Sequence, residues 1–354
     1  MKPFPPAAGA SPRLSRRTLL TAASAAACSI ALPAFAQAQP LKIRYQLDWR
    51  IVASSTPYVY ALRKGYFLDE GLDVTLNVGT GSAGTVTRIA AGNAEMGTGD
   101  ISALAEFAAN NPGIPARAVM LIYEHTAAAA FALKKSGIAR PGDLKGRKLA
   151  APVSDTGRKL FPLFAAANGL DAAQDVSWMS VEPAMREAML VRGQTDVITG
   201  NMSSALVSLG KLGVPRGDVV VMRYSDHGVP LYGNAILAHP QFMREHPKAV
   251  TGFLKAYLRA VRDINVDRAG GIAVLKQYEP LIDEKNELAG LDIIIDQELA
   301  SPNARQNGVG HIDPEKFRRG IDMLSKVTAL NTTPRYEDLI DMSLLPARAD
   351  RMVF

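Results

Sequence analysis

The stretch that decides the fold is residues 42–78, KIRYQLDWRIVASSTPYVYALRKGYFLDEGLDVTLNV. It begins with a short strand-like run at 42–47 and passes through a polar loop into a helical stretch at 57–64. It ends in a second strand-like run at 73–78. Because strands and helices alternate, this stretch predicts the start of an open, mainly parallel α/β sheet.

The same alternation continues along the chain in two units. The first unit continues with a helix at 85–91, a strand at 96–99, a helix at 101–109 and a strand at 118–123. The second, after the sequence PGDLKG at 141–146, has a strand at 148–151, a helix at 157–168, a strand at 176–179, a helix at 184–192 and a strand at 196–199. One more strand is expected at 234–238, and most of the remainder is helical. The tail has too few strands for a third sheet, so we expect it to form a helical layer on the first unit.

These units predict two lobes. The first is discontinuous, residues 41–136 together with 231–354, and the second is residues 137–230. The chain would cross between them near Lys134–Pro141 and return near Tyr224–Gly233, and two such crossings make a hinge. The carboxyl ends of the strands then face a common cleft, where open α/β sheets bind ligands.

The N-terminus carries an export pattern. Residues 1–36 contain the paired Arg16 and Arg17, an uncharged Ala-rich run and a terminal AFA triplet. This order predicts a twin-arginine signal peptide that is cleaved near Ala36, and therefore a protein that works in the periplasm. Attachment of a lipid at Cys28 is the alternative.

Removal of this leader changes the composition of the working protein. The leader takes four positive charges and no negative one with it, which lowers the formal charge from +6 to +2. No run of five or more like charges remains, so we expect no nucleic-acid partner. Cys28 is the only cysteine, which excludes disulfides and thiolate metal sites from the mature chain. The five histidines show no metal-ligand spacing, so the sequence predicts neither a metal nor a cofactor.

In the first lobe, the ligand-binding candidates follow the predicted strands. A tryptophan between two charged residues at a strand end predicts stacking on a flat ligand, and Asp48 beside it can accept a hydrogen bond from an amine or a ring N–H. The GTGSAG sequence at 79–84 follows the second strand rather than the first, so it predicts backbone N–H groups facing a ligand rather than a dinucleotide site. Asp100 is either a helix N-cap or a ligand contact. The candidates of this lobe are Asp48, Trp49, Arg50, Ser55, Gly81, Ser82 and Asp100.

In the second lobe, the sequence SDTGR at 154–158 follows a strand and opens a helix. It supplies hydroxyls, N–H donors and a cation at a positive helix end, which makes it the best candidate for an anion site. Two more polar loops follow strands of this lobe. The candidates are Ser154, Thr156, Arg158, Asn201, His227 and Tyr232.

The sequence gives little support for an enzyme. It contains no G-x-S-x-G, H-E-x-x-H or G-x-x-x-x-G-K-[ST] sequence. We therefore expect a binding protein without catalytic residues. The alternative of another class is a secreted enzyme on the same fold that uses cleft carboxylates, with Asp48, Asp100 and Asp226 as candidates.

Four stretches carry a resemblance to a known family: LDW at 47–49, ALRKGYFLDEGL at 61–72, GNAEMG at 92–97 and DLKG at 143–146. Together they resemble the periplasmic substrate-binding proteins of ABC importers for nitrate, taurine, aliphatic sulfonates and thiamine-precursor pyrimidines, the NMT1-like family. The resemblance covers about residues 41–261. It implies a two-lobe periplasmic-binding-protein fold of type II, a monomer, and a membrane permease as partner.

Within this family, LDW and the GVPLY sequence at 228–232 look closest to the branch that binds pyrimidines or other flat heteroaromatic ligands. The chain departs from that branch after Trp49, where it reads RIVASS. Arg50 and Arg158 leave room for a sulfonate, nitrate or aromatic carboxylate instead. A sensing role on a membrane receptor is a further alternative to import.

Overall fold

We describe the chain from a computed structural model that covers residues 1–4, 39–113, 116–326 and 328–354. Residues Pro40–Phe354 form one compact unit, and the segment before them is a separate unit. Residues 5–36, which hold most of the expected signal peptide and Cys28, lie outside the described residues. The twin-arginine route, the cleavage near Ala36 and the lipid alternative therefore stay predictions.

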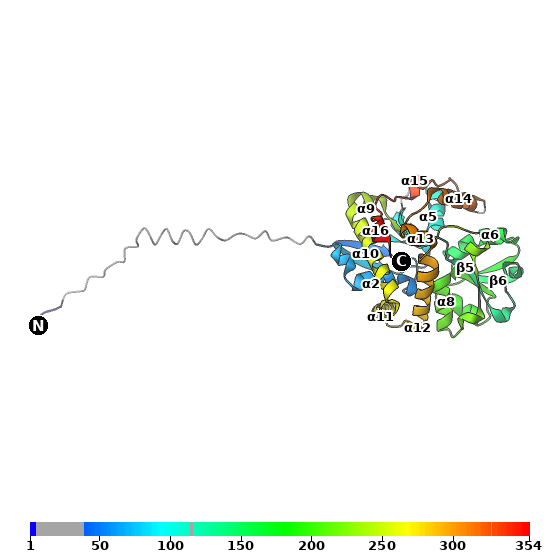
Figure 1. The fold of residues 1–354 in the computed structure, drawn as a ribbon, viewed down its shortest axis with the longest axis horizontal. Coiled ribbons are helices and arrows are strands. Elements are labelled where there is room, and N and C mark those ends of the chain that lie inside the picture. The colour runs from blue at the N-terminus through cyan, green and yellow to red at the C-terminus, as the bar shows by residue number, and fades with distance from the viewer. Residues whose placement is uncertain (5–38, 114–115, 327) are drawn as a thin grey trace. The chain divides into compact units, whose positions relative to one another are not determined.

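The described part of the compact unit contains two five-stranded sheets (Figure 1). The first has the order β2-β1-β3-β10-β4, with β1 Leu41–Gln46, β2 Leu72–Asn77, β3 Met96–Asp100, β4 Arg117–Leu121 and β10 Asn234–Ala238. The second has the order β7-β6-β8-β5-β9, with β5 Ala128–Leu133, β6 Arg147–Ala151, β7 Val176–Ser180, β8 Val197–Asn201 and β9 Val219–Arg223. In each described sheet one strand, β10 or β5, runs opposite to the other four. The predicted two-lobe, mainly parallel α/β fold is confirmed.

The first crossing between the lobes comes earlier than expected. β5 already belongs to the second sheet, so the chain crosses between Leu121 and Ala128 rather than near Lys134–Pro141. The second lobe therefore begins before residue 137. Its first strand, AAAFAL, is buried along its whole length and is mostly alanine. Because alanine is depleted in strands, β-propensity does not identify this central strand from the sequence. The second crossing lies between β9 and β10, in the expected segment.

Helices follow the strands and pack on the sheets. In lobe 1 they are α2 Thr56–Arg63, α3 Tyr66–Asp69, α4 Ser82–Ala90 and α5 Ile101–Asn110, and in lobe 2 they are α6 Thr156–Ala167, α7 Arg186–Val191 and α8 Met202–Lys211. The tail contains α9 Pro240–Glu245, α10 Pro247–Val266, α11 Arg268–Tyr278, α12 Glu284–Ile293, the π-helix η6 Ile294–Leu299, α13 Pro302–Asn307, α14 Pro314–Ser325, α15 Tyr336–Leu339 and α16 Arg348–Arg351. α10 presents one apolar face, on which Phe253 stacks with Tyr45 and Phe67 at ring-centroid distances of 4.7 Å.

The tail covers more than the first lobe, contrary to expectation. α10 and α11 pack on α2 of lobe 1, whereas α12 packs on α8 of lobe 2 (Figure 1). Two glycines bring α8 and α12 close together. A β carbon on Gly290 would lie 2.2 Å from Val207, and one on Gly210 would lie 2.6 Å from Asn286. The buried carboxylate of Glu287 fixes this contact, because it accepts from the N–H of Ala53 at 2.6 Å and pairs with a lysine of α8 at 2.8 Å.

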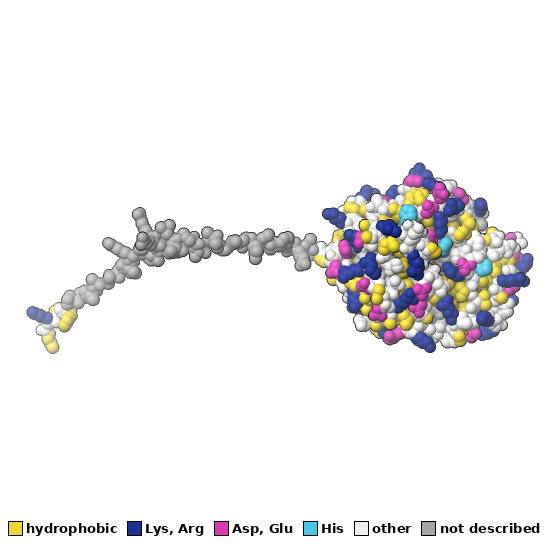
Figure 2. Space-filling model, in the orientation of Figure 1, with side chains coloured by type: hydrophobic (Ala, Val, Ile, Leu, Met, Phe, Trp, Pro, Cys, Tyr) yellow, Lys and Arg dark blue, Asp and Glu magenta, His cyan; other side chains and the backbone are white. Residues whose placement is uncertain are grey.

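The surface mixes both signs of charge on the face that Figure 2 shows. In the described ranges, no helix is long and apolar enough to span a membrane. The same ranges contain no group of three His, Cys, Asp or Glu side chains arranged to hold a metal ion.

Candidate functional site

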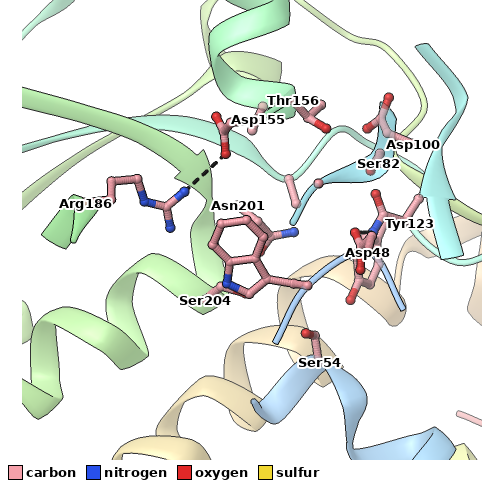
Figure 3. Close-up of a pocket in the computed structure, with 15 residues that line it drawn as sticks. Asp48, Ser54, Ser82, Asp100, Tyr123, Asp155, Thr156, Arg186, Asn201 and Ser204 are labelled. Atoms are coloured by element: carbon pink, nitrogen blue, oxygen red, sulfur yellow. Dashed lines mark hydrogen bonds and ion pairs between the residues drawn. The ribbon is translucent and has the colours of Figure 1, made fainter. Parts of the chain in front are cut away.

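A pocket lies between the lobes, at the carboxyl ends of their strands (Figure 3). Its empty volume is about 560 Å³, part of it open to solvent. Lobe 1 contributes Asp48, Trp49, Ser54, Gly81, Ser82, Asp100 and Asn234, the first crossing and β5 contribute Tyr123, Ala127 and Ala128, and lobe 2 contributes Asp155, Thr156, Arg186, Asn201 and Ser204. The pocket therefore occupies the predicted place for a ligand in this fold.

Four helices begin at the pocket because each follows a strand that ends there. α4 and α6 begin at Ser82 and Thr156, and α5 and α8 begin directly after Asp100 and Asn201. Three of these helices are capped by a side chain: Asp100 accepts from the backbone of α5, Asp155 from α6, and Asn201 from α8. These caps satisfy N–H groups of the first turn. The capped helix ends therefore have fewer free N–H groups for a bound anion than uncapped N-termini have.

Asp48 and Asp100 are the acidic groups of lobe 1 in the pocket. Asp48 accepts a hydrogen bond from Asn234 Nδ2 at 2.7 Å, and Asp100 accepts from the backbone and hydroxyl of Ser102. Burial raises the pKa of each carboxyl from 3.8 to about 6, although these hydrogen bonds act in the opposite direction. The charge of Asp100 raises the pKa of Asp48 further. Neither carboxylate forms an ion pair with a described residue.

Arg186 is the cation of the pocket, and it is already paired. Its guanidinium points at Asp155 in Figure 3, at 3.1 Å, and donates to Glu187 Oε1 at 2.6 and 3.0 Å. The side chain is only 1% exposed. A β carbon on Gly200 would lie 2.3 Å from this guanidinium, so glycine is required where the two pack. Since two carboxylates surround one cation, the Asp155–Arg186–Glu187 cluster is net negative.

Trp49 lies in the wall of the pocket and is 9% exposed. The guanidinium carbons of Arg186 and Arg50 lie 5.1 and 5.6 Å from the centroid of its ring. Its indole Nε1 is buried without a hydrogen-bond partner among the described residues. The ring therefore already contacts a cation from the opposite lobe.

The lobes also touch at the rim of the cleft. Ser154 Oγ donates to the carbonyl of Thr80 at 2.9 Å, and Lys159 pairs with Glu106 at 2.9 Å. A β carbon on Gly81 would lie 2.5 Å from the carbonyl oxygen of Ser154. These contacts join lobe 1 to lobe 2, so the structure shows the cleft closed.

The pocket brings together seven of the thirteen candidates from the sequence. They are Asp48, Trp49, Gly81, Ser82, Asp100, Thr156 and Asn201. The position of these side chains agrees with the strand-end argument, and their contact with a ligand stays a prediction. Asp100, for which two roles were open, both caps α5 and lines the pocket.

Three other candidates lie beside the pocket rather than in its wall. Ser154 lies at the rim. Ser55 hydrogen-bonds the backbone of Val52 at 2.6 and 3.0 Å, and its neighbour Ser54 lines the pocket instead. Arg50 and Ser55 line a small cavity that shares Asp48 and Trp49 with the pocket, and Arg50 also lines a separate groove.

The last three candidates lie in lobe 2 and in the segment that returns to lobe 1, and their side chains point away from the pocket. Arg158 donates to the carbonyl of Ala151 and to Ser180, at 3.1 and 2.9 Å. His227 packs edge-on against a phenylalanine of α6. Tyr232 faces the tail, where its hydroxyl accepts from a backbone N–H at 3.0 Å. Arg158, the cation expected to bind an anionic ligand, is therefore absent from the described pocket wall, where Arg186 is the cation instead.

Sequence reasoning missed several residues of the pocket: Ser54, Tyr123, Asp155, Arg186, Ser204 and Asn234. Asp155 carried a signal, because an aspartate directly before a helix is an N-cap and therefore lies at the strand end. Arg186 carried none. The adjacent charges of Arg186 and Glu187 are typical of an exposed helix face, and only tertiary packing turns both inward.

Comparison with known proteins gives one family match. Residues 52–267 match the model of the family described as NMT1/THI5 like. One relative is the 4-amino-5-hydroxymethyl-2-methylpyrimidine phosphate synthase THI13 of Saccharomyces cerevisiae, 24% identical over 70% of this chain and 72% of the yeast protein.

Other relatives are binding proteins. The riboflavin-binding protein RibY of Chloroflexus aurantiacus is 27% identical over 87% of this chain and 90% of its own. The formylaminopyrimidine-binding protein of Halalkalibacterium halodurans is 24% identical over 80% of this chain and 84% of its own. Among solved structures, the periplasmic aliphatic sulphonate binding protein SsuA of Escherichia coli superposes with a TM-score of 0.65 at 16% identity, covering 86% of this chain and 92% of SsuA. That likeness shows the periplasmic-binding-protein fold.

Proposed function

Because the chain belongs to the NMT1/THI5-like family, we propose that it is the solute-binding component of an ABC importer and that it captures a small, flat nitrogen heterocycle between its lobes. One observation carries this choice of ligand. Of the described residues in the pocket wall, three are carboxylates and one is a cation, and that cation is fully paired.

The two unpaired carboxylates favour a ligand that donates hydrogen bonds. Asp100 is buried and Asp48 is partly buried, and among the described residues only hydroxyl and amide groups hydrogen-bond to them. A buried carboxylate without a counter-charge gains most from N–H donors, and more from a cationic group than from a neutral one. An aminopyrimidine supplies such donors through its amino group, and through a ring nitrogen when that nitrogen is protonated. The indole of Trp49 provides the apolar wall that a flat ring needs.

A sulfonate, nitrate or aromatic carboxylate fits this pocket poorly. Such an anion would face Asp48 and Asp100 at close range, and like charges brought together in a buried interface cost several kcal/mol. Of the two arginines that favoured an anion in the sequence, Arg158 is not in the pocket wall, and Arg50 lines only a small cavity that adjoins it. The resemblance to a sulphonate-binding protein supports the fold and not the ligand.

We propose binding without chemical conversion. The relative named as a synthase and the carboxylates of the pocket favour the alternative, a secreted enzyme. Mass spectrometry of the ligand recovered after long incubation separates the two: an unchanged ligand supports a binding protein, and a product mass supports an enzyme.

Titration calorimetry of residues 40–354 tests the ligand class. The panel contains aminopyrimidines, riboflavin, aliphatic sulfonates, nitrate and aromatic acids. We expect one heterocycle to bind, with loss of affinity in Asp48→Asn and Asp100→Asn. Asp73→Asn is the matched control, because Asp73 is an exposed aspartate of β2. A sulfonate that binds equally well to wild type and to Asp48→Asn would overturn the proposed ligand.

We also propose that the chain is exported by the twin-arginine route, works as a monomer in the periplasm and delivers its ligand to a membrane permease. Replacing Arg16 and Arg17 by lysine tests the route, and the mass of the exported protein distinguishes cleavage near Ala36 from a lipid on Cys28. Retention of the double-lysine variant in the cytoplasm supports the proposal, and unchanged export contradicts it.

A further inference from the structure

Each of the two tryptophans of the chain has an arginine over its ring, at nearly the same distance. The guanidinium carbon of Arg158 lies 5.0 Å from the ring centroid of Trp178, and that of Arg186 lies 5.1 Å from that of Trp49. The first pair lies entirely within lobe 2. The second pair joins lobe 2 to lobe 1 and lies in the wall of the pocket.

Lobe 2 holds Arg186 in place without help from lobe 1. Asp155 and Glu187 fix its guanidinium through three hydrogen bonds, and Gly200 leaves the space in which it lies. When the cleft opens, the guanidinium keeps both acidic partners and loses only the indole of Trp49. Opening therefore leaves no buried charge unpaired, and the contact can form and break reversibly.

We propose that Arg186 is a positioning residue for Trp49, and that the two side chains form a latch that holds the cleft closed. The proposal rests on the proposed capture of a ligand between two lobes. On closure, the indole covers the one face of the pocket that carries a cation. A cation–π contact is stronger when it is shielded from water, and Arg186 is 1% exposed.

The other polar contacts across the cleft are weaker candidates for this role. Lys159 and Glu106 are both well exposed, at 42% and 28%, and surface ion pairs contribute little to stability. The hydrogen bond from Ser154 to Thr80 is neutral and lies at the rim. The ion pair of Lys211 with the buried Glu287 also joins lobe 2 to the tail, but it lies outside the wall of the pocket. Among these contacts, Trp49–Arg186 is therefore the buried one in the pocket wall itself.

The distance between the lobes tests the latch without any ligand. Residues 40–354 contain no cysteine, so spin labels on Asp73→Cys in lobe 1 and Lys135→Cys in lobe 2 report opening alone. In wild type we expect a short-distance population without ligand, because the closed contacts are made by the chain itself. This population should fall about tenfold relative to the open form in Trp49→Leu and in Arg186→Lys.

Arg158→Lys is the matched control, since it weakens an arginine–tryptophan contact of nearly the same distance within one lobe. It should leave the distance distribution unchanged. Trp49→Leu keeps every ion pair of Arg186, so it remains informative if Arg186→Lys fails to fold. A ligand-free wild type with only the long distance, or a Trp49→Leu protein with the wild-type distribution, overturns the latch.

The kinetics of ligand binding distinguish a latch from a side chain that only lines the pocket. If Trp49 is part of a latch, Trp49→Leu raises the dissociation rate about tenfold and leaves the association rate unchanged. Failure of the whole ligand panel contradicts the proposed function and leaves the distance experiment valid. A loss of affinity without any change in the distance distribution makes Trp49 a ligand contact only, against the proposal.

Discussion

Asp48→Asn should stabilise the ligand-free protein while it weakens ligand binding. Burial raises the pKa of Asp48 from 3.8 to about 6, so the folded state disfavours the ionised carboxylate. The stability that the neutral form provides is complete below about pH 3.8 and is lost as the pH rises to 6. This difference in pKa between the folded and unfolded states corresponds to a loss in the free energy of unfolding of about 3 kcal/mol at pH 7.5 and about 1 kcal/mol at pH 4.5. Asparagine carries no charge, and its carbonyl oxygen can still accept from Asn234.

Urea unfolding of wild type, Asp48→Asn and the exposed control Asp73→Asn at both pH values measures this effect. We expect the free energy of unfolding of Asp48→Asn to exceed that of wild type by up to about 3 kcal/mol at pH 7.5, with most of the gain lost at pH 4.5. Asp73→Asn should match wild type at both. If Asp48→Asn is less stable at pH 7.5, or its gain is the same at both pH values, burial of the charge is not what raises the pKa.

Three further changes act on other buried positions. Arg186→Met leaves two buried carboxylates without their cation and should lower the free energy of unfolding in urea by about 3–5 kcal/mol. Gly290→Ala should lower the melting temperature, because its β carbon would lie 2.2 Å from a side chain of α8, whereas the uncrowded Gly142→Ala should not. Burial raises the pKa of Glu298 from 4.5 to about 7, so the folded state disfavours its ionised carboxylate. In urea unfolding at pH 8, the free energy of unfolding of Glu298→Gln should exceed that of wild type by about 3 kcal/mol, and this gain should be lost as the pH falls to 4.5.

The fold was largely predictable because its signals are local. The alternation of strands and helices from residue 42 onward predicted two α/β units, and the motifs at 61–72 and 143–146 predicted the family. The errors came from tertiary burial. β5 is an alanine-rich strand that is buried on both faces, and α12 packs on lobe 2 through glycines whose partners are distant in sequence. Neither feature has a periodicity that distinguishes it from its surroundings.

The pocket was predictable to the extent that strand ends determine it. Asp48, Gly81 and Asn201 follow strands, and the topology alone brings them together. The charge of the pocket was not predictable, because it depends on which arginine turns inward. Arg158 follows a strand and turns to Trp178, whereas Arg186 begins a short helix and turns into the pocket. The proposed preference for a ligand without negative charge therefore depends on the structure and not on the sequence.

The pH dependence of binding distinguishes the two ways in which a heterocycle can pair with Asp48 and Asp100. A ligand that donates N–H groups favours the ionised carboxylates, so binding lowers their pKa from about 6 and releases protons. Affinity should then fall as the pH drops below 6. A ligand that accepts from the neutral carboxyl groups would take up protons and bind better in acid. Calorimetry at pH 6 in two buffers of different ionisation enthalpy counts these protons. Proton release supports a donor ligand, and proton uptake, or no exchange in a protein that binds, contradicts it.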